Sequence, residues 1–505
     1  MYKNGSVASA HHLATEAGVS ILMKGGNAVD AAVATAIALS VVDPQNSGLG
    51  GLGGFATVFL QKEQKVFVVD FGPKAPSKSS PDMFLNSSNT IGHKAVSIPT
   101  VLKGLYKLAQ AYGSLPFAEL FEPAVKIAEE GFPINSALYQ AMQEPHLDSE
   151  TKRNYQTTSL REGDILKLPE YAQILKLIGV GGEDAFYQGE IGDLIIKTIN
   201  EGKGIITKED LINCEAKITE PGKINFYGYD IYFPLLYSGG VTMGQILKLI
   251  EHFDLQNCSQ IELTEILYKV MQQAFMDRRR ILEKPDFKKE DVLLLLEDAY
   301  NSDLYQKMRR NEKVVHTIAD SCGGHTTHLC TADGQGNMVS LTQSNGQLWF
   351  GSGVTVKGTG IILNCGMSQY STDPNHPNAP LPNRKNLSNM TPTIVIKDGK
   401  PFLAIGTPGS TRIISIVAAA LIGIIVFKRS LKEALDAPRV HTEGDILWLE
   451  KNVFTDGILE TLNNKYHIDY LTNGHFYGST TGIQAVNGLL IPEVDYRFPG
   501  FGSGY

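Results

Sequence analysis

The segment GGHTTHLC, residues 323–330, places two threonines between two histidines directly after a pair of glycines. These side chains allow three interpretations: the tip of an ordinary hairpin, a pair of metal ligands, or the position of a nucleophile. As metal ligands, His325 and His328 would point to opposite faces of a strand, and no cluster of Asp, Glu or Cys at a recognised spacing adds further ligands. We therefore expect neither a metal nor another cofactor.

The nucleophile interpretation centres on Thr326. A threonine hydroxyl needs a base beside it, and the residue's own α-amine is one such base. The reference pKa of an α-amine, about 7.7–8, suits a general base near neutral pH. Thr326 would have to become an N-terminus, so the chain would break after His325. Taken alone, the segment is better explained as an ordinary strand, because threonine is common in strands.

The rest of the chain predicts a mixed α and β fold that would position this segment. Apolar spacing and turn signals predict elements along the whole chain, without repeats or low-complexity linkers. We therefore expect one interleaved α+β unit. Helices are expected over residues 10–42, 95–215, 242–284 and 411–427, a strand over 224–233, a charged stretch over 284–315 that ends in an exposed connector, and hairpins at 55–71, around DGQGN, TIVIKDGKPFLAIG and GIQAVNGLLIPEV.

Composition excludes several classes of protein. The formal net charge is −8 and no segment concentrates Lys and Arg, so nucleic acid is not an expected partner. The strongest apolar run, residues 413–427, has 15 residues, fewer than the roughly 20 that a membrane-spanning helix needs. No apolar stretch follows Lys3, so we expect no signal peptide, no membrane association and a cytoplasmic location.

Two residue types with possible chemistry receive structural interpretations. The five cysteines include no CxxC pair, and we expect reduced, buried thiols even for Cys322 and Cys330, which flank the opening segment. The glycine run SGLGGLGGF, residues 47–55, lacks the lysine of a phosphate-binding loop. We expect close backbone packing there.

Many blocks together change the interpretation of Thr326. HHLATEAGVSILMKGGNAVDAAVATAIALSVVDPQNSGLGGLGGF, YGSLPFAELFEPAVKIAEEGFPI, YSGGVTMGQILKLIE, GGHTTH, DGQGNMVSLTQSN, LSNMTPTIV and GTPGSTRI occur in this order. The chain thereby resembles the γ-glutamyltranspeptidase family from about residue 5 to Tyr505. The resemblance implies an N-terminal-nucleophile hydrolase with an αββα four-layer sandwich. It also implies a precursor that cuts itself into a large piece, residues 1–325, and a small piece, residues 326–505, which stay associated.

The catalytic residues implied by the resemblance fall on four positions. Thr326 is similar to the family nucleophile, which attacks a γ-glutamyl amide and forms an acyl-enzyme that water or an amine resolves. Gly409 and Ser410, in GTPGST, match the glycine pair whose backbone N–H groups form the oxyanion hole. Ser344 falls where the family has a threonine near the nucleophile and keeps the hydroxyl.

The substrate-binding positions match less well. Ser388 matches the first of two serines that contact the glutamyl carboxylate, Asn389 replaces the second, and Asn345 falls near a substrate-contacting asparagine. Gly72, in DFGP, replaces the arginine that binds the α-carboxylate, and Gln369, in MSQY, replaces the aspartate that binds the α-ammonium. Losing two such hydrogen-bonded charges costs about 3–6 kcal/mol, or about 10²–10⁴ in affinity.

Two nearby features bear on these losses. Lys74 lies two residues from the arginine position, but an ammonium does not reproduce a bidentate guanidinium. The proline-rich segment 371–385 falls at the place of the family's lid over the glutamyl site. A plain surface connection explains it equally well.

Three functional hypotheses follow. The first is a self-cleaving Thr amidohydrolase or transferase that acts on glutathione and related γ-glutamyl amides, with water or an amine as acceptor. The second is an acylase for glutaryl or cephalosporin-type amides, which lack the α-amine. The third is an uncleaved, catalytically silent relative that serves in binding or assembly. The oligomeric state does not follow from the sequence.

Overall fold

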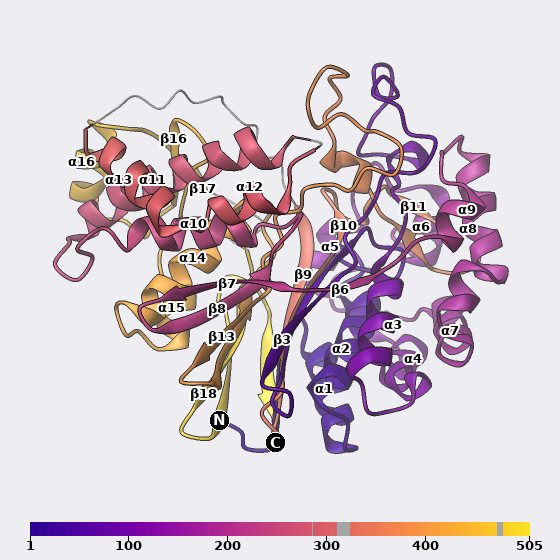
Figure 1. Ribbon diagram of the computed structural model, residues 1–505. Coiled ribbons are helices and arrows are strands. Elements are labelled where there is room, and N and C mark those ends of the chain that lie inside the picture. The colour runs from indigo at the N-terminus through magenta and orange to yellow at the C-terminus, as the bar shows by residue number, and fades with distance from the viewer. Residues whose placement is uncertain (285, 311–323, 472–477) are drawn as a thin grey trace.

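The computed structural model describes residues 1–284, 286–310, 324–471 and 478–505, so Cys322 and Gly323 lie outside the described residues. Two stacked β-sheets form the centre of the molecule, with helices on both outer faces (Figure 1). The four layers therefore run helix, sheet, sheet, helix, which confirms the predicted αββα sandwich.

The first sheet contains seven strands in the order β20-β1-β9-β10-β2-β3-β6. All its pairings are antiparallel. Strands from both sides of residue 325 alternate across this sheet, because β1 lies between β20 and β9. Its strands are β1 (Gly5–Ser9), β2 (Gly53–Leu60), β3 (Lys65–Asp70), β6 (Lys217–Thr219), β9 (His325–Asp333), β10 (Met338–Gly346) and β20 (Phe501–Gly504).

The second sheet has six strands in the order β19-β18-β14-β13-β8-β7. A small apolar cluster joins it to the first sheet, with Ala8, Cys330 and Met338 on one side and Ile394 and Ala404 on the other. The strands are β7 (Pro221–Phe226), β8 (Tyr229–Pro234), β13 (Thr393–Lys397), β14 (Lys400–Gly406), β18 (Thr481–Val486) and β19 (Leu489–Val494).

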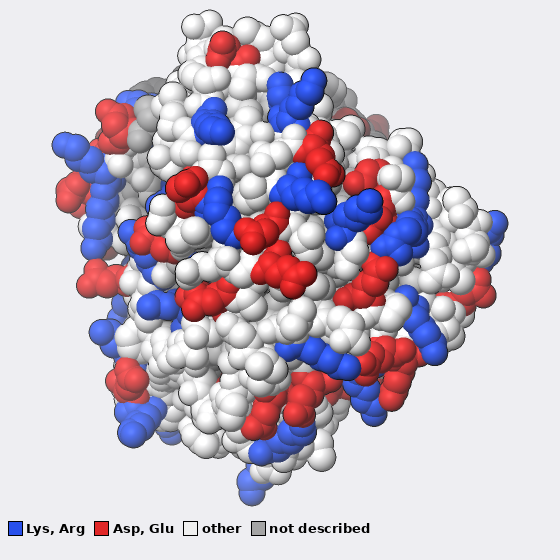
Figure 2. All heavy atoms as spheres, turned by 90° about the vertical axis from the view of Figure 1, so that its right-hand side faces the viewer, with Lys and Arg blue, Asp and Glu red and all other residues white. Residues whose placement is uncertain are grey.

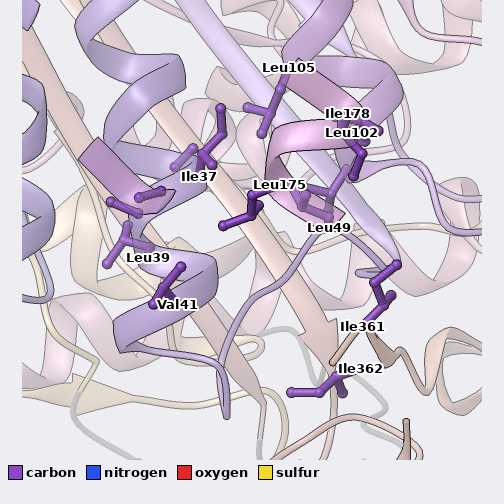
Figure 3. Close-up of a cluster of buried hydrophobic side chains, with 14 of the residues drawn as sticks. Ile37, Leu39, Val41, Leu49, Leu102, Leu105, Leu175, Ile178, Ile361 and Ile362 are labelled. Atoms are coloured by element: carbon purple, nitrogen blue, oxygen red, sulfur yellow. The ribbon is translucent and has the colours of Figure 1, made fainter. Parts of the chain in front are cut away.

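One helical layer packs on the first sheet around α2, which is buried along its whole length. Figure 3 shows Ile37 and Val41 of α2 in one apolar cluster with Leu102 and Leu175 of two other helices. The helices on this side are α1 (His12–Met23), α2 (Ala28–Val42), α3 (Val101–Tyr112), α4 (Glu122–Glu130), α5 (Ser136–Ala141), α6 (Ser149–Asn154), α7 (Pro169–Tyr187), α8 (Glu190–Glu201) and α9 (Lys208–Ile212).

The other helical layer covers the second sheet. The apolar run at 413–427 forms the buried helix α14, as predicted, and its side chains pack with those of α10 and the sheet. The helices here are α10 (Gly240–Ile250), α11 (Gln260–Asp277), α12 (Lys289–Leu294), α13 (Asp298–Arg309), α14 (Arg412–Ile425), α15 (Leu431–Leu435) and α16 (Asp456–Asn463).

Short elements complete the chain. A small sheet pairs β15 (Val440–His441) with β16 (Ile446–Glu450) and β17 (His467–Leu471), and two-stranded pairs join β4 (Phe132–Pro133) to β5 (Ile165–Leu166) and β11 (Val354–Thr355) to β12 (Ile362–Leu363). The turns η1 (His93–Ala95), η2 (Phe117–Phe121) and η4 (Gly366–Gln369) are 3₁₀-helical, whereas η3 (Arg278–Leu282) is π-helical.

The glycine run before β2 packs closely, as expected from the sequence. A Cβ atom at Gly50 would lie 2.2 Å from the carbonyl oxygen of Ile362, and one at Gly53 would lie 2.1 Å from that of Phe71. Gly53 also has a φ of 133°, a conformation that side chains disfavour. The run brings β2 alongside the end of β10.

One element prediction was wrong. Residues 224–233 form a hairpin rather than one strand, because Tyr227 and Gly228 take positive φ values of 48° and 79° in a two-residue turn. Tyrosine is an uncommon residue at the first position of such a turn, so the sequence pattern did not indicate a turn there. The charged stretch at 284–315 carries the helices α12 and α13 in its described part. Its end, residues 311–315, where the connector was expected, lies outside the described residues, as does residue 285.

Charge is mixed on the outer face of the first helical layer. Figure 2 shows Lys and Arg interspersed with Asp and Glu on this side of the molecule. Among the described residues, no helix is both long enough and apolar enough to cross a membrane.

Candidate active site

Thr326 lies at the start of β9, in the centre of the first sheet. It pairs directly with Ser344 near the end of β10, and its side chain is buried. The Thr326 hydroxyl donates a hydrogen bond to Ser344 Oγ at 3.0 Å, and Ser344 Oγ donates to the carbonyl oxygen of His325 at 2.6 Å. The Gly346 N–H donates to Ser344 Oγ at 2.9 Å. The peptide bond between His325 and Thr326 therefore has a hydroxyl on its carbonyl oxygen and a second hydroxyl, that of Thr326, beside it.

The turn between β14 and α14 holds the two predicted oxyanion donors. Gly409 and Ser410 have φ values of 136° and 57°. A φ of 57° is left-handed, which explains why glycine suits the second position and why serine there is strained. Neither backbone N–H donates a hydrogen bond within the described part of the chain. Once the chain in front of them moves aside, both donors could serve a developing negative charge.

The chain before the cleavage position packs on this turn. A Cβ atom at Gly324 would lie 3.0 Å from Ser410 Cβ and 3.1 Å from its backbone nitrogen. With the chain intact, Gly324 therefore lies over one of the two donors. Breaking the bond after His325 would free this segment to move away.

A cavity of about 610 Å³ opens in front of Thr326. Most of the residues predicted for the site line it: Thr326, Ser344, Gln369, Ser388, Asn389 and Ser410. Gly409 instead lines a second, smaller cavity that also reaches Thr326. The structure thus gathers residues from β9, β10, η4, the segment before β13 and the turn before α14.

Asn345 lies apart from this cavity. The pairing of β9 and β10 shifts register between Ser344 and Gly346. Beyond that shift the Asn345 side chain is fully buried, and its Nδ2 donates to the carbonyl oxygen of Pro44 at 2.9 Å. Its place in the structure is that of a support for the turn after α2, and the predicted substrate contact is not seen.

The floor of the cavity rests on Arg278, which the sequence gave no separate reason to single out. Arg278 Nη2 donates at 2.8 Å both to the carbonyl oxygen of Ser388 and to Asn389 Oδ1, and Nη1 donates to the carbonyl oxygen of Ser238 at 3.0 Å. Burial lowers the pKa of Arg278 to about 10, so it stays charged near neutral pH. The π-helical turn η3 places Arg278 and Arg279 at the cavity.

A charged pair, Arg279 and Glu443, lines the cavity wall. Arg279 contacts Glu443 at 3.4 Å, and Glu443 also accepts hydrogen bonds from Thr411 and lies 3.2 Å from His441 Nε2. Burial alone would raise the pKa of Glu443, but His441, Thr411 and Arg279 together hold it below its usual value. In the sequence, Arg279 lies in the run MDRRRILEK, and the spacing of this run does not show which of its arginines faces the cavity.

The position of the family's carboxylate-binding arginine is occupied differently. Gly72 does not line the substrate cavity, and Lys385 lies beside it with Nζ 2.6 Å from both carboxylate oxygens of Asp70. Lys74 does not line the cavity either, and it contacts Glu215 at 3.2 Å. The suggested compensation by Lys74 is therefore not seen.

The two histidines of the opening segment have separate environments. His325 packs against Trp349, with ring centroids 5.1 Å apart. His328 is buried between the sheets beside Thr342 and Cys330, and burial lowers its pKa to about 3. No group of three or more potential metal ligands was found among the described residues.

Comparisons with known proteins agree with this geometry. The family model described as Gamma-glutamyltranspeptidase matches residues 14–505. A glutathione hydrolase proenzyme of Bacillus subtilis is 35% identical, with 99% of this chain and 89% of that protein aligned. An Acylase ACY 1 proenzyme of a Pseudomonas species is 33% identical over 89% of this chain and 84% of that protein. The solved structure of a cephalosporin acylase from Bacillus halodurans is 28% identical, has a TM-score of 0.89, and covers 100% of this chain and 96% of that one.

Proposed function

The chain belongs to the γ-glutamyltranspeptidase family, and on that premise we propose that it cleaves itself after His325 and then hydrolyses or transfers γ-glutamyl groups through Thr326. It is an enzyme of the N-terminal-threonine amidohydrolase type. The observation that carries the proposal is the hydrogen-bonded series from Thr326 Oγ1 through Ser344 Oγ to the carbonyl oxygen of His325.

Self-cleavage begins at this series. Ser344 donates to the carbonyl oxygen of His325 and so favours negative charge on it. The Thr326 hydroxyl attacks the carbonyl carbon, the bond to the Thr326 nitrogen breaks, and that nitrogen takes up a proton and becomes an α-amine. The intermediate is an ester between His325 and Thr326 Oγ1, and water hydrolyses it.

Amide turnover then uses the new N-terminus. The free α-amine of Thr326 accepts the proton of its own hydroxyl, which attacks the acyl carbon of the substrate. The bond from that carbon to the substrate nitrogen then breaks, and the α-amine passes the proton to the leaving amine. The N–H groups of Gly409 and Ser410 stabilise the oxyanion, and one such donor typically contributes about 2.7–4 kcal/mol. Ser388 and Asn389 contact the acyl chain, on the floor that Arg278 supports. A small γ-glutamyl amide is the substrate class, with water or an amine as acceptor.

The acylase hypothesis stays as a second candidate because of Gln369 and Gly72. Neither residue supplies the charge that would bind a free α-ammonium or α-carboxylate, and Lys385 beside Gly72 is already paired with Asp70. A glutaryl group needs no α-ammonium site. The comparison of γ-glutamyl-p-nitroanilide with glutaryl-p-nitroanilide separates the two candidates, since the main proposal requires the first to be turned over faster.

Cleavage itself is tested on a denaturing gel. We expect purified protein to give two pieces, residues 1–325 and 326–505, and Thr326→Ala to stay whole. Thr326→Ser, which keeps a hydroxyl, should still be cut. A single stable wild-type band after long incubation would favour the silent relative, the third hypothesis. The cytoplasmic location and the association of the two pieces after cleavage stay predictions.

A further inference from the structure

The smaller of the two cavities that reach Thr326 has no assigned role. It has a volume of about 30 Å³ and is lined by His325, Thr326, Gly409 and Asp43, among others. One water molecule needs about 10–15 Å³ measured in this way, so the cavity has room for a water directly beside the bond to be cut. The substrate cavity is much larger and lies against the same two residues, Gly324 and Thr326.

Asp43 is the only carboxylate on this cavity among the described residues. It follows α2 directly and its side chain is 6% exposed. Its Oδ1 accepts hydrogen bonds from Gln45 Nε2 and Asn46 Nδ2, both at 2.8 Å. Its Oδ2 is buried and has no hydrogen-bond partner in the described part of the chain. A buried carboxylate oxygen without a partner is costly, so this atom calls for a ligand that donates a hydrogen bond.

The turn that carries Asp43 is fixed to the cleavage site. The Asn345 backbone N–H donates to the carbonyl oxygen of Asn46 at 3.0 Å, and the Asn345 side chain donates to that of Pro44. Asn345 directly follows Ser344, whose hydroxyl contacts His325. Asp43 is thus held in a set position relative to the peptide bond after His325.

The other titratable side chains on the cavity are His11 and His325. Burial, with a smaller effect from His12, lowers the pKa of His11 to about 3, so that His11 is neutral near pH 7. Burial raises the pKa of Asp43 to about 7, although the Asn46 amide and the neighbouring Thr327 hydroxyl oppose the rise. A carboxylate with such a pKa takes up and releases protons near neutral pH, as a general base must.

We propose that Asp43 holds the water that completes self-cleavage and removes a proton from it. This inference rests on the proposed function, because it needs the ester between His325 and Thr326. It assigns to Asp43 a step that substrate turnover does not use, since the substrate approaches from the other cavity.

Hydrolysis of the ester consumes one water. The water oxygen bonds to the carbonyl carbon of the His325 ester while one of its protons passes to Asp43 Oδ2. The bond from that carbon to Thr326 Oγ1 then breaks, and Thr326 Oγ1 takes the proton back from Asp43. The products are the carboxyl group of His325 and the free hydroxyl of Thr326, and the peptide bond has gained one water in total.

The test is a pulse–chase experiment on the full chain. The chain is labelled during cell-free translation, and its cleavage at 325/326 is then followed over time. Asp43→Asn should lower the rate at which the 325/326 cut appears by about 10²-fold or more. Hydroxylamine added to this variant should release the large piece as a hydroxamic acid, heavier than the acid by the mass of an NH group, because the ester has accumulated. Asp43→Glu should restore cutting in part. In the wild type, the rate of cutting should rise with pH through about 7 and then level.

Three further variants make the result specific. Ala137→Leu, which fills the same cavity without touching the carboxyl group, should also slow cutting and accumulate ester. Asp82→Asn, at an exposed carboxyl group, should behave as wild type. Thr326→Ala should give neither a cut nor hydroxylamine release.

The outcomes separate the two proposals. If the wild type is never cut, the proposed function fails. If the wild type is cut and Asp43→Asn or Ala137→Leu is cut equally fast, or if Asp43→Asn stops without forming an ester, only the role of Asp43 and its water is overturned. Equally fast cutting in Asp43→Asn would point to the newly freed α-amine of Thr326 as the base for ester hydrolysis.

Discussion

Lys385 Nζ lies 2.6 Å from each carboxylate oxygen of Asp70, directly beside Gly72. The ion pair is largely buried, with side-chain exposures of 18% and 9%. It therefore fills the space that a longer side chain at position 72 would enter. A Cβ atom at Gly72 would lie 3.2 Å from Lys385 Cε.

This arrangement predicts that Gly72→Arg alone gains little. The new guanidinium would meet the charge of Lys385, whereas in Gly72→Arg with Lys385→Ala it could pair with Asp70 and still reach an α-carboxylate. We expect the double variant to lower the KM for γ-glutamyl-p-nitroanilide by about 10-fold. Lys385→Ala alone is the control. An unchanged KM in the double variant would show that position 72 does not face the acyl group.

Gln369→Asp should change acyl selectivity. The new carboxylate would face an α-ammonium, and a hydrogen bond to a charged group contributes about 1.5–3 kcal/mol. The ratio of kcat/KM for γ-glutamyl-p-nitroanilide over glutaryl-p-nitroanilide should therefore rise by about 10- to 100-fold. Gln369→Asn keeps the position neutral and should leave the ratio near the wild-type value. Equal ratios in both variants would remove Gln369 from the substrate site.

Ser344→Ala should slow self-cleavage. The substitution removes the donor to the carbonyl oxygen of His325 and the acceptor for the Thr326 hydroxyl. We expect the rate of the 325/326 cut to fall by about 10- to 100-fold. Mass spectrometry of the small piece measures this rate. Ser344→Thr keeps the hydroxyl and serves as the matched control. Equal rates in Ser344→Ala and wild type would contradict the role of this hydroxyl.

Ser410→Gly should stabilise the protein. Ser410 has a φ of 57°, and a side chain in that region costs about 1–2 kcal/mol, partly offset by the greater freedom of glycine in the unfolded chain. The free energy of unfolding in urea should rise by about 0.5–1 kcal/mol. Ser410→Val, with a branched Cβ, should lower it. A loss of stability in Ser410→Gly would mean that the serine side chain makes a contact that outweighs the strain.

Asp43→Asn should stabilise the chain only above acid pH. The folded-state pKa of Asp43 is raised from 3.8 to about 7, so the unfolded chain binds fewer protons between these values. The free energy of unfolding of a chain that keeps Asp43 should therefore fall as pH rises through this window and stay level above it. The uncleavable Thr326→Ala chain serves as the parent. In urea, the free energy of unfolding of Thr326→Ala with Asp43→Asn should equal that of Thr326→Ala at about pH 4 and exceed it at about pH 8. A constant difference at both pH values would contradict the raised pKa.

Periodicity and turn chemistry predicted most of the layers. The mostly apolar sequences within 10–42 and 411–427 predicted helices there, and both α2 and α14 are buried. The DG and NG turns predicted the hairpins β13–β14 and β18–β19. The turn at Tyr227 and Gly228 escaped, because its left-handed first residue is not glycine or asparagine.

The sequence predicted those site residues that lie in recognisable motifs, and it did not predict the residues that support them from elsewhere in the chain. Thr326, Ser344 and Ser410 lie together because adjacent strands and one turn bring them there. Arg278 comes from a helix end far away in sequence, and no local pattern shows that it supports Ser388. Asn345 does not line the substrate cavity, because the pairing of β9 and β10 shifts register between Ser344 and Gly346. The roles assigned to these residues stay predictions until the variants are measured.

The alternation of β20, β1 and β9 has a consequence for the lifetime of the enzyme. A severed molecule that loses this shared sheet becomes two diffusing fragments, whose reunion is bimolecular and competes with aggregation. The uncut chain, in contrast, refolds on its own. Cutting would therefore turn a reversible equilibrium into a one-way loss, and durability would be set by the height of the unfolding barrier.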